Sequence, residues 1–330
     1  MLRLVRVVIQ YGLVVPLIPV YLLFLWMIVK HRKADPFKTS FFGLVFSCGV
    51  TDICFLFHYM LLLRVPAEGY LIWLFQSAGR PLAQFILLGY YYWQHAQALG
   101  VLLLGLNRFT ALVMPAAHSS LWVRSKTMKL VALQYLTALL LILPLHYRCS
   151  YCFELRHNSS SLGIAVVDRR VRIYCSSLSF GTLTTVYLCV TAMCMCLYVS
   201  MWNSMRTKTK RTEPDNRSAT VRQMRHRKAQ ANLAVSGGIV TCSLMCVTVH
   251  QIIGALFLQY IQASIYYPIG GILTNVFSLV NPLALFCSSV KCRQFFKRII
   301  TGGAQDAVQL RQIKTPRVVL SPTQHRVEIP

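Results

Sequence analysis

The sequence predicts an all-α membrane protein, a bundle of seven transmembrane helices with the N-terminus outside. Hydrophobic residues make up 55% of the 330 residues and charged residues only 13%, against about 25% charged residues in soluble domains. Several apolar runs reach the roughly 20 residues that a helix needs to cross about 30 Å of hydrocarbon. These runs predict seven spans, at about residues 7–29, 40–63, 82–107, 128–145, 179–202, 231–258 and 264–288.

The distribution of basic residues predicts the orientation. The chain has 34 Lys and Arg against nine Asp and Glu, a net charge of +25. Such a balance is also typical of nucleic-acid-binding proteins, but here the basic residues lie between the apolar runs, so no nucleic-acid partner is expected. With the N-terminus outside, the cytoplasmic segments hold 25 of the 34 basic residues, as the positive-inside rule requires. These segments are residues 30–39, 108–129, 203–228 and 289–330.

Two of the cytoplasmic segments, 203–228 and 289–330, have further features. Residues 203–228 carry nine basic residues and are predicted to form a loop that anchors two helices or docks an acidic partner. Apolar and basic residues alternate at helical spacing over 289–300, which predicts a short amphipathic helix in contact with membrane lipids. Residues 301–330 are polar and contain three prolines, so a disordered tail is expected there.

The predicted outer loop at 146–178 contains two features of an oxidising compartment. Asn158 begins an Asn-Ser-Ser sequon and is the expected glycosylation site. Cys149, Cys152 and Cys175 lie in the same loop, where a disulfide is possible, but the spacing does not decide which two pair. No Cys/His group has zinc spacing, so neither a metal nor a cofactor is expected.

Asp52 is the only acidic residue inside any predicted span, close to the middle of the second. An ionisable group at that depth indicates a functional site facing the bundle interior, although a protonated structural aspartate would look the same. Asn281 is the preferred partner and Asn275 the second choice. A single acid cannot form a paired-carboxylate protease site, and neither HExxH nor GxSxG is present, so no enzyme activity is expected.

The third span carries polar residues along one helical face. Tyr90 and Arg108 are eighteen residues apart, which is five turns and about 27 Å of helix. Tyr90, Gln94 and Gln97 are the predicted ligand-binding residues on the outer half of this face, and hydrogen bonding between helices is the alternative. Asn107 and Arg108 are predicted to form a switch at the cytoplasmic end, unless Arg108 is only a positive-inside anchor.

Several of these features together resemble a G-protein-coupled receptor: an arginine closing the third span, Asn281-Pro282 in the seventh, and an amphipathic helix after it. The strings "KTSFFGLVFSCGVTDI" (38–53) and "HAQALGVLLLGLNRFTALVMPAAHSSLW" (95–122) resemble the nematode serpentine chemoreceptors of class gamma. The resemblance implies a plasma-membrane receptor, in that family found on sensory cilia, that binds an external small molecule and activates a heterotrimeric G protein. A seven-span transporter or channel subunit is the alternative.

The chain departs from the rhodopsin-like pattern at several positions. Asn107 replaces the acid that usually precedes the arginine, and Leu285 stands where a tyrosine usually follows the Asn-Pro pair. The sixth span has no proline and only three glycines, Gly237, Gly238 and Gly254. No cysteine lies near the outer end of the third span, so the usual disulfide from that helix to the second outer loop cannot form.

Overall fold

The computed structural model describes residues 2–33, 37–155, 162–168, 170–210, 217–257, 263–288 and 293–294. Its elements are α1 (Leu2–Lys30), α2 (Ser40–Phe57), η1 (His58–Arg64), α3 (Val65–Ala67), α4 (Ile72–Val113), α5 (Pro115–Leu121), α6 (Arg124–Arg148), β1 (Tyr151–Leu155), β2 (Leu162–Val166), α7 (Arg172–Lys210), α8 (Arg217–Phe257) and α9 (Ala263–Ser288). Asn158, the tail 301–330 and most of the predicted helix 289–300 lie outside the described residues. The chain divides into two units, Met1–Ser289 and Val290–Pro330, and every element above belongs to the first.

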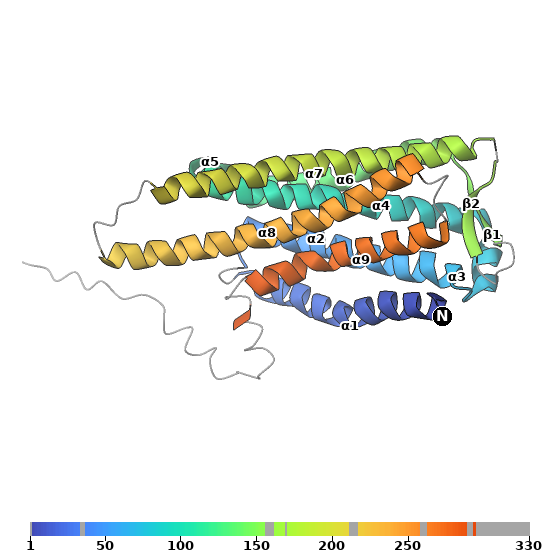
Figure 1. Cartoon of the computed structure of the whole chain (residues 1–330), viewed down its shortest axis with the longest axis horizontal. Helices are drawn as coiled ribbons and strands as arrows, with labels where there is room; N and C mark the ends of the chain where they lie inside the picture. Colours follow the sequence, from blue (N-terminus) through green and yellow to red (C-terminus); the bar gives the residue numbers. More distant parts are fainter. Residues whose placement is uncertain are drawn as a thin grey trace, which may run out of the picture. The chain divides into compact units, whose positions relative to one another are not determined.

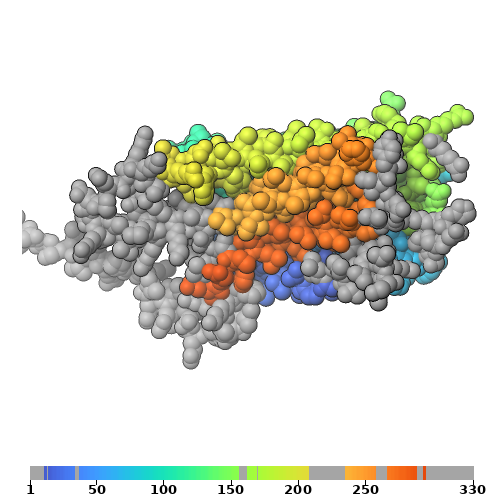
Figure 2. Space-filling view, in the orientation of Figure 1, coloured from blue at the N-terminus to red at the C-terminus, as the bar shows by residue number. Residues whose placement is uncertain are grey.

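The long helices run alongside one another, which confirms the predicted helical membrane bundle (Figure 1). Among the described residues, six helices are long and apolar enough to cross a membrane, and Val14–Lys30 of α1 adds a shorter apolar helix. Helix α4 lies at the centre, in contact with α2, α6, α7 and α8. Helix α9 closes the bundle by packing on α1, α2 and α8. Figure 2 shows α7, α8 and α9 side by side on one face.

The two ends of the bundle differ. One end, here called the hairpin end, carries α3, the antiparallel β1–β2 hairpin and the start of α1 (Figure 1). The other end carries α5 and the last turns of α4 (Figure 1). It is called the Arg108 end here, because Arg108 lies in those last turns.

The described helices α7 and α8 continue well beyond the predicted spans. Residues 203–228 were predicted to form a loop, but α7 runs to Lys210 and α8 begins at Arg217, so most of this segment is helical. The hydropathy falls there because the residues are basic and polar, yet Lys, Arg and Gln are good helix formers. Low hydropathy marks the end of a membrane span, not the end of a helix.

Two local distortions shape the hairpin end. The second span continues from α2 into the π-helix η1, in which backbone bonds join residues five apart. In α4, Gly79 has φ +65°, so a short first segment meets the long helix at a kink. A positive φ is readily adopted only by glycine, which places this kink where the sequence allows it.

Candidate functional site

A cavity of about 370 Å³ lies at the hairpin end of the bundle. Its walls come from η1, α3, α4, both hairpin strands, α7, α8 and α9. The volume is at the lower end of the range for small-molecule sites, which are usually concave and largely apolar. A second, much smaller cavity of about 10 Å³ lies between Tyr21, Arg108 and Asn281.

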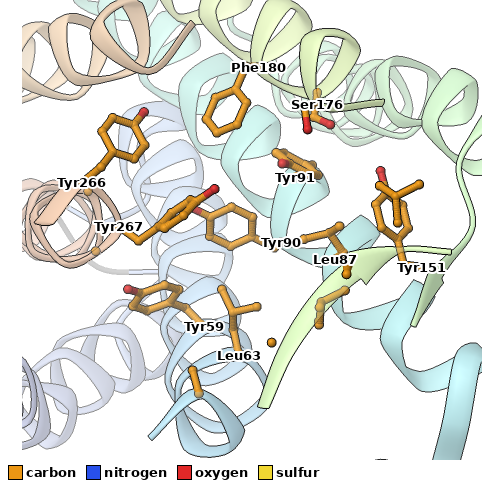
Figure 3. A pocket seen from close by; sticks show the side chains of 18 of the residues that line it. Tyr59, Leu63, Leu87, Tyr90, Tyr91, Tyr151, Ser176, Phe180, Tyr266 and Tyr267 are labelled. Carbon is orange, nitrogen blue, oxygen red and sulfur yellow. The ribbon is translucent and has the colours of Figure 1, made fainter. Parts of the chain in front are cut away.

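Aromatic side chains form a large part of the cavity wall. The labelled tyrosines in Figure 3 come from η1, α4, β1 and α9 and surround the space. The ring centroids of Tyr59 and Tyr90 are 6.0 Å apart, and those of Tyr90 and Tyr91 are 5.4 Å apart. Such rings offer flat apolar surfaces, and the hydroxyl groups add hydrogen-bonding positions at their edges. The aromatic lining residues are Tyr59, Tyr90, Tyr91, Tyr151, Phe153, Phe180, Tyr266 and Tyr267.

The π-helix η1 brings Tyr59 and Arg64 to the same wall. Both residues line the cavity, together with Leu63 between them. Residues five apart are about 140° apart around an α-helix at 3.6 residues per turn. A turn of π-helix takes more residues than a turn of α-helix, so the angle between residues five apart is smaller. The wider winding therefore helps to bring Tyr59 and Arg64 to the same wall.

Two arginines line the cavity, each paired with a carboxylate. Arg64 donates to Glu68 at 2.5 Å, and both side chains are buried, with 9% and 1% of their surfaces exposed. Arg172 lies 3.8 Å from Glu154, and this pair is about half exposed. Neither glutamate belongs to the lining, and no other Asp or Glu does among the described residues. The charges that face the space are therefore cations.

A disulfide and the hairpin cover the cavity. Cys149, directly after α6, is bonded to Cys175 in the first turn of α7. The Gln84 side chain on α4 donates to the Cys149 carbonyl at 2.9 Å and accepts from the Tyr151 amide at 3.1 Å. These bonds tie the start of β1 to α4. The disulfide lies inside the one loop, and Cys152 remains a free thiol.

Helices α8 and α9 form the remaining wall through a reciprocal pair of residues. The rings of His250 and Tyr266 are stacked with centroids 4.1 Å apart, and the Tyr266 hydroxyl donates to the His250 carbonyl at 3.1 Å. A Cβ at Gly254 would collide with the Tyr266 ring, and one at Gly270 with the His250 ring. Glycine at these positions lets the two helices approach closely enough for the pair to form.

Asp52 is the centre of a buried polar network in the middle of the bundle. Only 2% of Asp52 is exposed. Its carboxylate accepts hydrogen bonds from the Tyr21 hydroxyl at 2.6 Å and from the Gln97 amide at 2.8 Å, and the Asn281 side chain also bonds to it. The Gln97 amide donates in addition to Ser278 at 2.8 Å. The network therefore joins α1, α2, α4 and α9.

Arg108 is held between helices at the opposite end. It is 8% exposed, its guanidinium lies 5.1 Å from the centre of the Phe41 ring, and it shares a side-chain hydrogen bond with Tyr198 on α7. Tyr198 in turn lies against Gly237 of α8, where any Cβ would collide with the phenol ring. Arg108, Tyr198 and Gly237 thus form a contact chain from α4 through α7 to α8.

The sequence of this helical bundle matches the model of a known family. The family model described as serpentine type 7TM GPCR chemoreceptor Srv matches residues 10–301. The chain belongs to this Srv family. Serpentine receptor class V-1 of Caenorhabditis elegans is 29% identical over 154 residues, which cover 46% of this chain and 49% of that receptor. The alignment with this curated relative thus spans about half of each chain.

The family match favours a chemoreceptor over the transporter or channel subunit that the sequence had left as the alternative. This Srv receptor is a multi-pass protein of the plasma membrane, and a transporter is not favoured. The predicted serpentine chemoreceptor family is confirmed, but class gamma is not, because the matching model is that of class Srv.

The three residues predicted to bind ligand lie in different environments. Tyr90 lines the cavity, whereas Gln94 is fully buried and Gln97 belongs to the Asp52 network. Neither glutamine lines the cavity. The predicted face therefore divides by depth: its first turn, at Tyr90, reaches the cavity, and Gln97 lies deeper, at Asp52.

Of the two predicted partners of Asp52, Asn281 bonds to its carboxylate and Asn275 lies elsewhere. The Asn275 amide instead lies 3.8 Å from the sulfur of Met60. Tyr21 was missed by sequence reasoning because a tyrosine in an apolar run is typical of ordinary packing. Asn107, which directly precedes Arg108 in the chain, donates to Ser40 at 3.4 Å.

Proposed function

We propose that this Srv receptor binds an external small molecule in the cavity at the hairpin end and activates a heterotrimeric G protein at the Arg108 end. The observation that carries the proposal is the arrangement along α4. Tyr90 lines the cavity, Gln97 bonds to Asp52, and Arg108 lies near the last turn of the same helix. One continuous helix therefore contacts the ligand site, the buried network and the end that would meet the G protein.

The Asp52 network supports a two-state mechanism. Four helices share the hydrogen bonds of one carboxylate, so a shift of α4 or α9 at the cavity changes their geometry in the middle of the bundle. A ligand that binds one arrangement more tightly shifts the population toward it by its difference in affinity. At the Arg108 end, Tyr198 of α7 connects α4 to α8. A change in the position of α4 would reach the G protein there.

Alanine at Tyr90 tests the site. We expect Tyr90→Ala to raise the agonist concentration for half-maximal nucleotide exchange by about five- to 150-fold, the equivalent of about 1–3 kcal/mol of lost contact. The agonist is first found by screening a chemical library with a calcium or cAMP readout in cells that express the receptor. Exchange on a purified G protein is then measured in membranes with matched receptor number.

Two variants on the same helix are the controls. Tyr92→Ala removes a tyrosine that does not line the cavity, and it should leave potency within about threefold. Gln97→Ala removes one buried hydrogen bond to Asp52 and one to Ser278, and it should lower expression or maximal activation more than potency. Equal potency shifts for Tyr90→Ala and Tyr92→Ala would contradict a ligand at this cavity.

The proposal requires the hairpin end to lie outside the cell. The basic segments between spans favour this orientation, and a disulfide at the hairpin end agrees with an oxidising compartment. We expect a C-terminal tag to be reached by antibody only after permeabilisation and Asn158 to carry a glycan that Asn158→Gln removes. A C-terminal tag stained in intact cells would overturn the orientation.

A further inference from the structure

We propose that the cavity takes a small organic acid, with its carboxylate at Arg64 and its aromatic or branched apolar body against the tyrosine wall. This inference rests on the proposed ligand site and names the chemical class of the ligand. Three features carry it: the cations in the lining, the unsatisfied donor of Arg64, and the shape of the aromatic wall.

The lining selects against a cationic ligand. Arg64 and Arg172 face the space, while their partners Glu68 and Glu154 do not belong to the lining. Among the described lining residues a buried ammonium group would meet no carboxylate, and an unpaired buried charge is strongly unfavourable. An anion would instead meet the two guanidinium groups before the carboxylates behind them.

One hydrogen-bond donor of Arg64 is unsatisfied within the described part of the chain. Its terminal nitrogen bonds to Glu68, but its Nε–H, which is buried, finds no hydrogen-bond acceptor within the described part of the chain. A buried donor without a partner destabilises the protein. This nitrogen has almost no solvent-accessible surface, so a ligand oxygen reaches it only when the Arg64 side chain shifts. The planar guanidinium carries several N–H groups in a fixed fork that matches a carboxylate.

The aromatic wall offers a surface for the apolar body of an organic acid. Tyr59 lies on the same π-helical wall as Arg64, and its ring is beside that of Tyr90. Figure 3 shows these rings and Leu63 around the same part of the cavity. A molecule with its acid group at Arg64 would place an apolar body on these rings. At about 370 Å³, the cavity suits a small ligand.

The test compares acids with uncharged and cationic molecules on the same carbon skeleton. The probes are 3-phenylpropionic acid, 3-phenylpropionamide and 3-phenylpropylamine, with the octanoic acid, octanamide and octylamine series in parallel. Binding to the purified full-length receptor is read from the rise in its unfolding temperature with probe concentration. We expect at least one acid to bind tenfold or more tightly than its amide and amine. An amine that binds as well as its acid, or no binding by either acid, overturns the proposal.

Two variants test the role of Arg64, and the first of them removes both charges of the buried ion pair together. Arg64→Gln with Glu68→Gln replaces the ion pair by two neutral amides, so the acid should lose tenfold or more in affinity while the amide changes less than threefold. Glu68→Gln alone removes the competing carboxylate, so the acid should bind more tightly. Unchanged acid affinity in both variants overturns the role of Arg64. Arg80→Gln is the matched control: Arg80 on α4 is exposed and does not line the cavity, so less than a threefold change in acid affinity is expected.

The same measurements separate the two proposals. Acid binding that depends on Arg64 but stimulates no nucleotide exchange would preserve the ligand class and contradict the signalling function. Exchange driven by a ligand without an acid group, with its potency lowered by Tyr90→Ala, would preserve the function and overturn the ligand class.

Discussion

Replacing Arg108 by lysine is expected to remove most G-protein activation while leaving surface expression and ligand binding close to wild type. Lysine retains the positive charge, so any contribution to membrane topology persists. It lacks the planar guanidinium that lies 5.1 Å from the Phe41 ring and shares a hydrogen bond with Tyr198. We expect maximal agonist-stimulated nucleotide exchange to fall about tenfold or more, in membranes matched for receptor number.

Arg124→Lys is the control for this variant. Arg124 begins α6 and is exposed, so the same replacement there changes no buried contact and should leave exchange unaffected. Normal signalling by Arg108→Lys would mean that Arg108 is an anchor for topology and not part of the activation mechanism. Loss of ligand binding together with exchange would instead indicate a general disruption of the bundle.

Removal of the Cys149–Cys175 disulfide is expected to have the largest effect on stability. The bond closes a loop of 26 residues, for which the chain-entropy model gives about 3.5 kcal/mol. It also fixes the Cys149 carbonyl that Gln84 bonds, so the hairpin would lose its attachment above the cavity. Replacement of both cysteines by serine should lower the unfolding temperature in detergent, reduce surface expression and weaken agonist binding.

The free thiol of the same loop offers a matched comparison. Cys152 lies in β1, three residues after Cys149, and is not bonded to another cysteine. Cys152→Ser should therefore unfold near the wild-type temperature, and reducing agent should lower the unfolding temperature of both wild type and Cys152→Ser. A double variant at positions 149 and 175 as stable as wild type would contradict a structural role for the bond.

Hydropathy predicted the membrane bundle because burial in lipid requires long apolar runs, whatever their internal packing. The same signal could not find the continuation of α7 to Lys210 or the start of α8 at Arg217, since helices outside the hydrocarbon need no apolar residues. The predicted outer location of residues 146–178 limited the candidates for the disulfide to three cysteines. Only the fold brings Cys175 next to Cys149.

The candidate site was less accessible to sequence reasoning. Helical spacing placed Tyr90, Gln97 and Arg108 on one face of the third span, but it could not reveal that the cavity ends above Gln97. Arg64 was counted only as a charge in an outer segment. A wheel drawn at 3.6 residues per turn separates Arg64 from Tyr59, whereas the π-helix brings both to one wall.

The length of α8 has a mechanical consequence. Gly237, against which Tyr198 packs, is twenty residues from the start of the helix at Arg217, a distance of about 30 Å along the axis at 1.5 Å per residue. A tilt of about 10° with its pivot at Gly237 would swing the Arg217 tip sideways by about 5 Å, close to the pitch of one helical turn. The helix is thus a lever arm, in which a displacement smaller than a bond length beside the pivot becomes a stroke of several ångströms at the tip.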